Sequence, residues 1–208
     1  CSSDLPWNLD LLKELEGKTG KRIWNILQLR VHPSLIPLKK ILTSSPGPHQ
    51  VQLTYITARG PWYSRSWKGA VEKSGGIATN IGIHLFDMLI WLFGAVDKLE
   101  VHAIDDRTCS GALTLEKAQV KWFLSTNEAW IPEDHLAKGH RSYRSIEIDG
   151  QAIEFSDGFT NLHSLVYQKT LSGNGFGLED TRAAIEVTHQ IRTQPPIGTN
   201  SRSHSLLK

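Results

Sequence analysis

Apolar and polar positions along the chain predict helices at both ends and strands between them. The run around Ile77–Phe93 is apolar nearly all round, which is typical of a buried helix that ends at Gly94. The last sixteen residues show neither helical spacing nor strand-like alternation of apolar residues and are expected to be irregular. Helical spacing, capping residues and a first-turn proline predict helices over residues 6–20, 33–42, 74–94, 161–171 and 178–192.

Alternating stretches predict a run of strands with few helices between them. The pair Asp149-Gly150 is a strong signal for a two-residue hairpin that leads into the extended stretch QAIEFS. Consecutive strands favour antiparallel pairing, so the predicted fold class is α+β (α/β), a largely antiparallel open sheet with helices on one face. A second subunit is the natural cover for the other face. The predicted strands span residues 21–30, 49–58, 96–107, 110–115, 118–125 and 141–148.

Three polar residues interrupt the predicted buried helix. Asn80, His84 and Asp87 are spaced i, i+4, i+7 and so fall within about 60° of one another. Unpaired polar groups there would cost about 1–3 kcal/mol each, so they need partners or a ligand. Histidine is the usual proton-transfer group near neutral pH, whereas the alternative is hydrogen bonding within the fold. Two ligands do not make a metal site, and none is predicted.

Residues 59–76 show neither the helical nor the strand pattern of apolar residues and are predicted to form a binding loop. Its cationic side chains would bind phosphate or carboxylate, and its aromatic side chains would stack on a base or sugar. An ordered surface loop packed by its own aromatics explains the composition equally well. Arg30 leaves the end of a predicted strand toward the same cleft. The candidates within the loop are Arg59, Trp62, Tyr63, Arg65, Trp67 and Lys68.

Three glycines, Gly173, Gly175 and Gly177, imitate a dinucleotide-binding fingerprint. That fingerprint follows a strand and places its third glycine three residues after the second, but this run follows a predicted helix with GxGxG spacing. It is therefore predicted to be a helix–helix turn, and no loop for cofactor phosphates is predicted.

Composition narrows the class of protein further. The 208 residues suit one sizeable domain, and a net charge of +2 with scattered basic residues predicts no nucleic-acid or membrane partner. Cys1 and Cys109 form no disulfide framework, which favours a cytoplasmic setting. His84 and Asp87 interrupt the stretch nearest in length to a membrane span, and no signal peptide is visible.

The segment SGGIATNIGIHLFDML resembles the GGGxxxDxGxHxxD-type segment of the Gfo/Idh/MocA oxidoreductases. LQLRVHPS, YITARGPWYSRSWKG and GFGLEDTRAAIEV narrow the resemblance to the WlbA/WbpB-like branch, which oxidises UDP-N-acetylglucosaminuronic acid at the sugar 3-position. The resemblance implies an N-terminal Rossmann domain that binds NAD, and a C-terminal domain with an open sheet. The GxGxxG and the catalytic Glu-Lys-Pro of the family lie before the point where this sequence begins. Residues 1–20 would then be a remnant helix at the junction with a missing Rossmann domain, and residues 21–208 the substrate-binding and oligomerisation domain.

The resemblance also implies roles for individual residues. His84 matches the motif histidine, which accepts the proton of the oxidised hydroxyl. Asn80 stands where many relatives have aspartate; an amide cannot act as a base, so we expect it to hydrogen-bond substrate. Asp87 is expected to orient or support the site. The further expected substrate-binding residues are Arg30, Arg59, Trp62, Tyr63 and Lys68.

The function implied is that of the substrate domain of an NAD-dependent sugar-nucleotide oxidoreductase acting on the 3-hydroxyl of a UDP-N-acetyl-hexosaminuronic acid-type substrate. Lipopolysaccharide biosynthesis and a homo-oligomer formed through the open sheet face are implied in the same way. NAD is expected to bind the full-length parent and not this fragment tightly. The alternative is a non-catalytic module for sugar-nucleotide binding or oligomerisation.

Overall fold

A computed structural model describes residues 5–153 and 160–207, and within them one six-stranded sheet organises the fold. The strand order is β2-β3-β4-β1-β5-β6. β1 pairs with β4 in parallel, and the other four pairings are antiparallel, which confirms the largely antiparallel open sheet. The strands are β1 (His49–Thr57), β2 (Val96–Ile104), β3 (Thr108–Leu115), β4 (Ala118–Ser125), β5 (Ser142–Ile148) and β6 (Gln151–Ile153).

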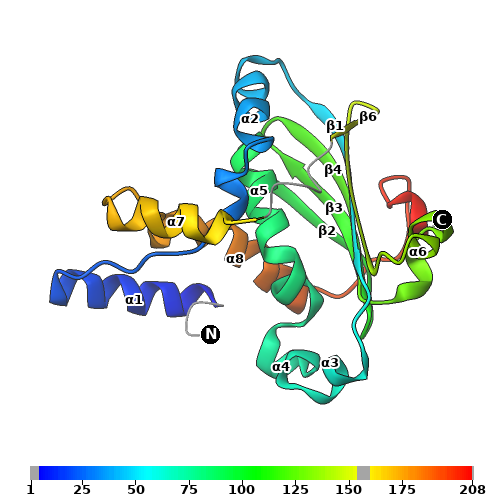
Figure 1. Cartoon of the computed structure of the whole chain (residues 1–208), viewed down its shortest axis with the longest axis horizontal. Helices are drawn as coiled ribbons and strands as arrows, with labels where there is room; N and C mark the ends of the chain where they lie inside the picture. Colours follow the sequence, from blue (N-terminus) through cyan, green and yellow to red (C-terminus); the bar gives the residue numbers. More distant parts are fainter. Residues whose placement is uncertain (1–4, 154–159, 208) are drawn as a thin grey trace.

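Helices cover the inner face of the sheet, as predicted (Figure 1). Most of α5 is buried, and its Phe86 meets Trp122 of β4 edge-on, with ring centroids 5.3 Å apart. Gly111 of β3 is required beneath that ring, because a Cβ there would lie 2.0 Å from the backbone oxygen of Glu100. The longer helices are α1 (Pro6–Thr19), α2 (Leu35–Ser44), α5 (Ile83–Phe93), α7 (Leu162–Leu171) and α8 (Leu178–Thr193).

The apolar helix predicted over residues 74–94 is confirmed over residues 76–93, but it is not α-helical throughout and a separate short helix precedes it. α4 (Val71–Ser74) ends at Gly75 and Gly76, whose φ angles are positive, and a π-helical turn, Ala78–Gly82, leads into α5. A Cβ at Gly82 would lie 2.7 Å from both Leu124 and Phe86, so glycine lets this turn approach the sheet. A π turn widens the helix locally and changes the angular phase of the residues that follow it.

The stretch Val71–Phe93 is long and apolar enough to cross a membrane by length and composition. Its mean hydropathy is 1.4, but 61% of the most apolar window is buried inside the fold. The core helix of a globular domain meets the same criteria, so this helix is weak evidence for a membrane span.

The strand predicted over residues 21–30 is wrong. This segment makes one isolated bridge, in which Asn25 donates its backbone N–H to the oxygen of Phe176 at 2.7 Å, and it then forms a 3-10 turn, Gln28–Val31. The segment runs beside the α7–α8 connection rather than along a sheet edge, so no ladder of backbone partners is available to it. Its buried Leu27 and Leu29 account for the strand-like pattern.

The predicted binding loop of residues 59–76 contains short helical turns rather than irregular chain. They are α3 (Pro61–Arg65), a 3-10 turn at Trp67–Gly69, and α4. A further short helix, α6 (Glu133–Ala137), follows the 3-10 turn Glu128–Trp130.

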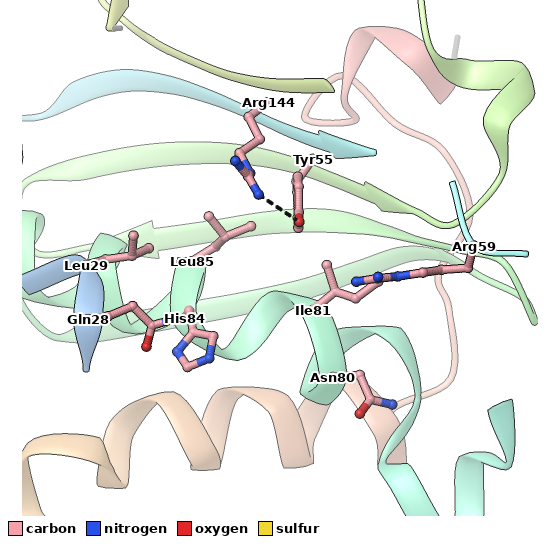
Figure 2. A pocket seen from close by; sticks show the side chains of 9 residues that line it. All are labelled: Gln28, Leu29, Tyr55, Arg59, Asn80, Ile81, His84, Leu85 and Arg144. Atoms are coloured by element: carbon pink, nitrogen blue, oxygen red, sulfur yellow. Dashed lines mark hydrogen bonds between the residues drawn. The ribbon is translucent and has the colours of Figure 1, made fainter. Parts of the chain in front are cut away.

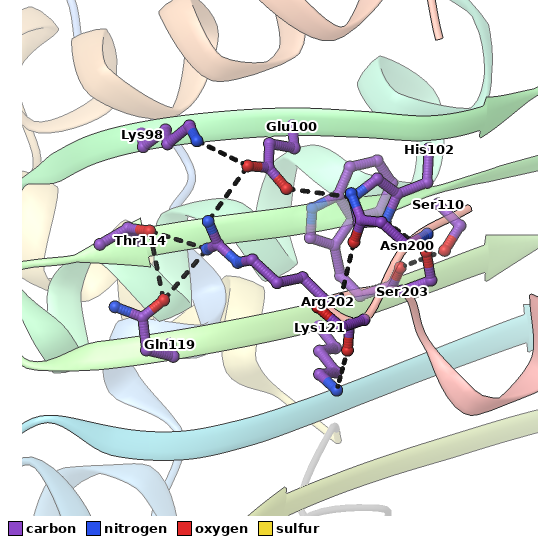
Figure 3. Close-up of polar contacts among 12 residues, drawn as sticks. Lys98, Glu100, His102, Ser110, Thr114, Gln119, Lys121, Asn200, Arg202 and Ser203 are labelled. Carbon is purple, nitrogen blue, oxygen red and sulfur yellow. Dashed lines mark hydrogen bonds and ion pairs between the residues drawn. The ribbon is translucent and has the colours of Figure 1, made fainter. Parts of the chain in front are cut away.

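The C-terminal tail, predicted to be irregular, crosses the outer face of the sheet (Figure 3). Arg202 donates hydrogen bonds to Glu100 Oε1 at 3.2 Å, Thr114 Oγ1 at 2.8 Å and Gln119 Oε1 at 3.0 Å. The hydrogen bond from Lys98 and the charge of Arg202 hold the pKa of Glu100 near 2, although its partial burial opposes them. The chain itself therefore covers part of the face for which a second subunit was expected.

Candidate functional site

A cavity of about 240 Å³ lies between α5, the Gln28–Val31 turn and the inner face of β1 and β5 (Figure 2). We call it the His84 pocket. Polar side chains dominate it, although Leu29, Ile81 and Leu85 form part of its wall. Its polar lining residues are Gln28, Tyr55, Arg59, Asn80, His84 and Arg144.

A second cavity, of about 350 Å³, is also lined by His84. Its wall includes Leu27, Ile83 and Ile185, so we call it the apolar pocket. His84 and Asn80 line both cavities and thus form a shared wall between them. A group on this wall can contact ligands on either side.

Burial sets the charge state of His84. Desolvation lowers the pKa of its imidazole, and the nearby His163 lowers it further. The ring is therefore uncharged near neutral pH and can accept a proton from a group in either cavity. His84, which was predicted to accept a proton, lines both cavities.

Asn80 is fixed by the chain itself. Its side-chain amide donates a hydrogen bond to the backbone oxygen of Lys68 at 3.2 Å, which ties the π turn to the preceding short helices. Tyr63 also interacts with the Asn80 side chain, and burial raises the pKa of its phenol. Asn80 therefore has a defined position beside His84.

Asp87 lines neither of these cavities. It is 2% exposed and pairs with Arg30, whose Nη2 donates to Oδ1 at 2.7 Å and whose Nε donates to Oδ2 at 3.1 Å. Burial raises the pKa of the Asp87 carboxyl, and Arg30 opposes that rise. The structure thus separates Asp87 from Asn80 and His84, with which it was expected to share one edge.

Arg30 lies away from the cavities too. Besides Asp87, it donates to the Asp180 carboxylate at 3.2 Å and to the Asp180 backbone oxygen at 2.6 Å. These bonds join the Gln28–Val31 turn to α5 and α8. The guanidinium group has a structural position, in contrast to the substrate contact expected from the sequence.

Among the substrate-binding residues predicted in the loop, Arg59 lines the His84 pocket, whereas Trp62, Tyr63 and Lys68 do not. Trp62 is exposed and meets Tyr63 edge-on at 5.8 Å. Tyr63 and Lys68 line a separate cavity of about 70 Å³. The structure therefore disperses the aromatic and cationic groups that the composition suggested as one site.

Sequence reasoning missed Tyr55 and Arg144. They are cross-strand partners in the β1–β5 register, Arg144 stacks 4.9 Å from the ring centroid of Tyr55, and its Nη2 donates to the Tyr55 hydroxyl at 3.3 Å. One signal could have found them. Side chains two residues apart in a strand point to the same face of the sheet. Tyr55 therefore shares a face with the buried Leu53, and Arg144 shares a face with the buried Ile146. This alternation places an arginine on the core-facing side of the sheet.

The glycines Gly173, Gly175 and Gly177 form a turn between α7 and α8, as predicted. The N–H of Gly177 donates to the Asp180 carboxylate at 2.8 Å, and a Cβ at Gly175 would lie 2.7 Å from the Trp24 ring. The N–H of Gly177 is therefore already paired, and the spacing of the three glycines differs from that of a dinucleotide-binding loop. Within residues 5–153 and 160–207, no group of three or more His, Cys, Asp or Glu side chains is arranged to hold a metal ion.

Comparison with known proteins identifies the class of the fold. The Gfo/Idh/MocA family model for "Oxidoreductase family, C-terminal alpha/beta domain" matches residues 47–123. The WlbA (WbpB) dehydrogenase from Thermus thermophilus, solved with NAD and alpha-ketoglutarate, is 49% identical, with a TM-score of 0.93. That alignment covers 98% of this chain and 66% of the dehydrogenase.

Two further structures agree. The Thermus thermophilus WlbA (WbpB) dehydrogenase in complex with NAD and UDP-GlcNAcA is 49% identical over 96% of this chain and 64% of that chain, with a TM-score of 0.91. WlbA from Bordetella pertussis, in complex with NADH and UDP-GlcNAcA, shares the fold at 18% identity and a TM-score of 0.71, over 90% of this chain and 66% of that one. The chain belongs to the Gfo/Idh/MocA oxidoreductase family and has the fold of its C-terminal α/β domain. It spans a little under two thirds of the length of the two Thermus relatives.

Proposed function

We propose that this chain is the substrate domain of an NAD-dependent sugar-nucleotide dehydrogenase, acting on the 3-hydroxyl of a UDP-N-acetyl-hexosaminuronic acid-type substrate. The observation that carries the proposal is the uncharged His84 on the wall between two cavities. The relatives at 49% identity are WlbA (WbpB) dehydrogenases, one of them in complex with NAD and UDP-GlcNAcA, which supports the choice of substrate class.

His84 is proposed to accept the proton of the sugar hydroxyl. An uncharged imidazole suits this task, because general-base catalysis needs a proton acceptor whose pKa lies near or below the working pH. NAD is assigned to the parent enzyme, where it supplies the hydride acceptor. No described residue is assigned to cofactor binding, because the turn at Gly173–Gly177 lacks the dinucleotide-binding spacing and the N–H of Gly177 already donates to Asp180.

Other residues support or contact the substrate in this proposal. Asn80 and Arg59 line the His84 pocket and are proposed to hydrogen-bond the sugar. Asp87 is proposed to hold α5, and hence His84, in place through Arg30. We assign Arg30 to this structural role, and we assign Trp62, Tyr63 and Lys68 no contact in the His84 pocket.

The domain division and assembly also belong to the proposal. Leu9 of α1 packs on Leu178 and Ile185 of α8, while Trp7 and Leu11 on the same helix are 56% exposed. An exposed apolar stripe fits a helix at a domain junction, with the substrate domain over residues 21–208. A homo-oligomer formed through the outer sheet face, a cytoplasmic setting and a place in lipopolysaccharide biosynthesis complete the proposal.

Substitution of His84 tests the proposal in the dehydrogenase that contains this domain. We expect His84→Asn to lower kcat about 10²- to 10⁴-fold, the range for loss of a general base, and to leave the Kd for UDP-GlcNAcA within about threefold. His140→Asn, at an exposed histidine, is the matched control and should leave both values unchanged. Unchanged turnover of His84→Asn would refute the assignment. Tight UDP-sugar binding by a parent without dehydrogenase activity would instead favour the non-catalytic binding module.

A further inference from the structure

Gln28 has a buried polar atom that the fold leaves without a partner. Its side-chain oxygen, Oε1, is one of four buried side-chain nitrogen or oxygen atoms in the described part of the chain that make no hydrogen bond within it. Of these four atoms, only the oxygen of Gln28 belongs to a residue that lines a cavity shared with His84. Because an unsatisfied buried acceptor costs stability, its place beside the proposed proton acceptor calls for an explanation.

The ion pair between Arg30 and Asp87 places Gln28 near His84. Arg30 lies two residues after Gln28 in the Gln28–Val31 turn, and Asp87 lies three residues after His84 on α5. Two hydrogen bonds, of 2.7 and 3.1 Å, join Arg30 to Asp87 and so fix this turn against α5. In Figure 2 the amide end of Gln28 points toward the imidazole ring of His84, and both side chains line the same pocket.

The burial of the Gln28 oxygen favours the imidazole as its partner over a ligand. A sugar in the pocket would not reach the oxygen where it lies, whereas the ring of His84 can turn toward it about its broad χ2 torsion. A neutral imidazole carries N–H on one nitrogen and a lone pair on the other. An oxygen that only accepts therefore favours N–H at the nearer nitrogen and leaves the lone pair at the farther one.

Other groups near His84 are less suited to orient it. Among the described residues that line its two cavities, none is a carboxylate. The Asn80 amide already donates to Lys68 and interacts with Tyr63. An amide oxygen carries no full charge, so it can orient the ring while burial keeps the ring uncharged near neutral pH. Besides the paired Arg30 and Asp87, the charged or titratable side chains around His84 are Tyr55, Arg59, Arg144, Lys73 and His163.

We infer that Gln28 is a positioning residue for His84: its side-chain oxygen accepts the N–H of one imidazole nitrogen, so the other nitrogen keeps its lone pair for the proton of the substrate hydroxyl. When that proton arrives, the imidazolium holds one N–H toward Gln28 and the new N–H toward the sugar oxygen. The inference rests on the proposed function of His84 and adds the residue that sets its tautomer.

Nuclear magnetic resonance of the 208-residue chain tests the contact without any substrate. In the unaltered chain, the imidazole nitrogen shifts should show one dominant tautomer of neutral His84. Gln28→Leu keeps a side chain of similar volume but removes the acceptor, so both tautomers should appear. The pKa of His84 should also fall in this variant, because the imidazolium loses an acceptor. Gln28→Glu keeps an acceptor oxygen at the same reach and adds a negative charge, so it should raise that pKa.

Kinetics of the dehydrogenase that contains this domain test the consequence for His84. Gln28→Leu should lower kcat about tenfold, the scale of one lost hydrogen bond, and leave the Kd for UDP-GlcNAcA within about threefold. Gln28→Glu should move the acidic limb of the kcat profile to higher pH, since His84 must be uncharged to accept a proton. In a His84→Asn background, Gln28→Leu should change kcat no further, because it acts through the imidazole.

A matched control is Gln168→Leu, at an exposed glutamine of α7, which should leave the tautomer, the pKa of His84 and kcat unchanged. Unchanged tautomer populations and pKa of His84 in Gln28→Leu would overturn the inference. So would a weaker Kd at unchanged kcat, which would make Gln28 a substrate contact. An equal loss of kcat with and without His84, together with a lower urea midpoint, would leave Gln28 only a structural role. The proposed function fails separately, if His84→Asn keeps full turnover while the resonance data still couple Gln28 to His84.

Discussion

The buried ion pair between Arg30 and Asp87 makes a sharp prediction about stability. The side chains are 12% and 3% exposed, and two hydrogen bonds join them at 2.7 and 3.1 Å. Arg30→Gln would leave the Asp87 carboxylate buried without its cation, and the nearby Asp180 carboxylate would oppose its charge further. Loss of one partner of a buried pair typically costs about 3–5 kcal/mol, so we expect a decrease of that size in the free energy of unfolding at pH 7.5.

The same variant should depend on pH in a direction that can be worked out. Burial already raises the pKa of Asp87 in the folded chain, and removal of Arg30 removes the main group that opposes this rise. A carboxyl whose pKa is higher in the folded state stabilises the fold in its protonated form, so stability is lost as pH rises through the folded pKa. The deficit of Arg30→Gln should therefore shrink as pH falls from 7.5 toward 5.

Urea unfolding at a series of pH values measures both effects, with the m-value as a check on two-state behaviour. The double variant Arg30→Gln, Asp87→Asn removes both charges and should recover much of the loss at pH 7.5. Glu128→Gln breaks the exposed pair with Arg141 and should cost less than about 1 kcal/mol. A deficit below about 1 kcal/mol for Arg30→Gln, or one that is flat from pH 5 to 7.5, would refute the reasoning.

Two further predictions concern the buried histidines and the tail. Nuclear magnetic resonance titration should find the pKa of His84 below 6.5 because the ring is buried. The pKa of His204 should lie near 4, because this ring is buried against the sheet. A pKa of His84 at or above 6.5 would contradict its proposed uncharged state. Arg202→Ala removes the hydrogen bonds to Glu100, Thr114 and Gln119, so we expect a loss of about 1–3 kcal/mol in urea unfolding and faster proteolysis within residues 194–207, whereas Arg192→Ala on α8 should leave tail cleavage unchanged.

Much of the fold could be predicted because its strands and helices carry local signals. Alternation placed β3, β4 and β5 to within about two residues at each end, and the Asp149-Gly150 pair marks the hairpin between β5 and β6. The strand predicted over residues 21–30 failed because buried leucines can face a helical layer as well as a sheet. Whether an extended segment joins a sheet depends on which distant segments lie beside it in the fold, and the local pattern of residues does not give this information.

The site residues likewise divide into those that local spacing reveals and those that depend on tertiary packing. His84 and Asn80 could be found from helical spacing because they lie close together on one helix and meet the same cavities. His84 and Asp87 lie three residues apart on the regular α5, so what separates them is the neighbour that each one meets, and the pairing of Asp87 with Arg30 of the Gln28–Val31 turn depends on tertiary packing. Arg144 reaches the pocket only through the register between β1 and β5, strands whose paired residues here are 89 positions apart.

The polar residues of the central helix therefore have two separate tasks. Asp87 pairs with Arg30, and Arg30 also binds Asp180. The Asp87 carboxylate therefore helps to hold α5 against α8 and is not available to a ligand. His84, one turn earlier, lies on the shared wall of two cavities and stays uncharged because it lacks such a partner among the described carboxylates and is largely desolvated. A carboxylate beside His84 would raise its pKa and weaken it as a proton acceptor near pH 6. The pairing of Asp87 with Arg30 thus keeps the carboxylate of this helix away from His84, the proposed proton acceptor.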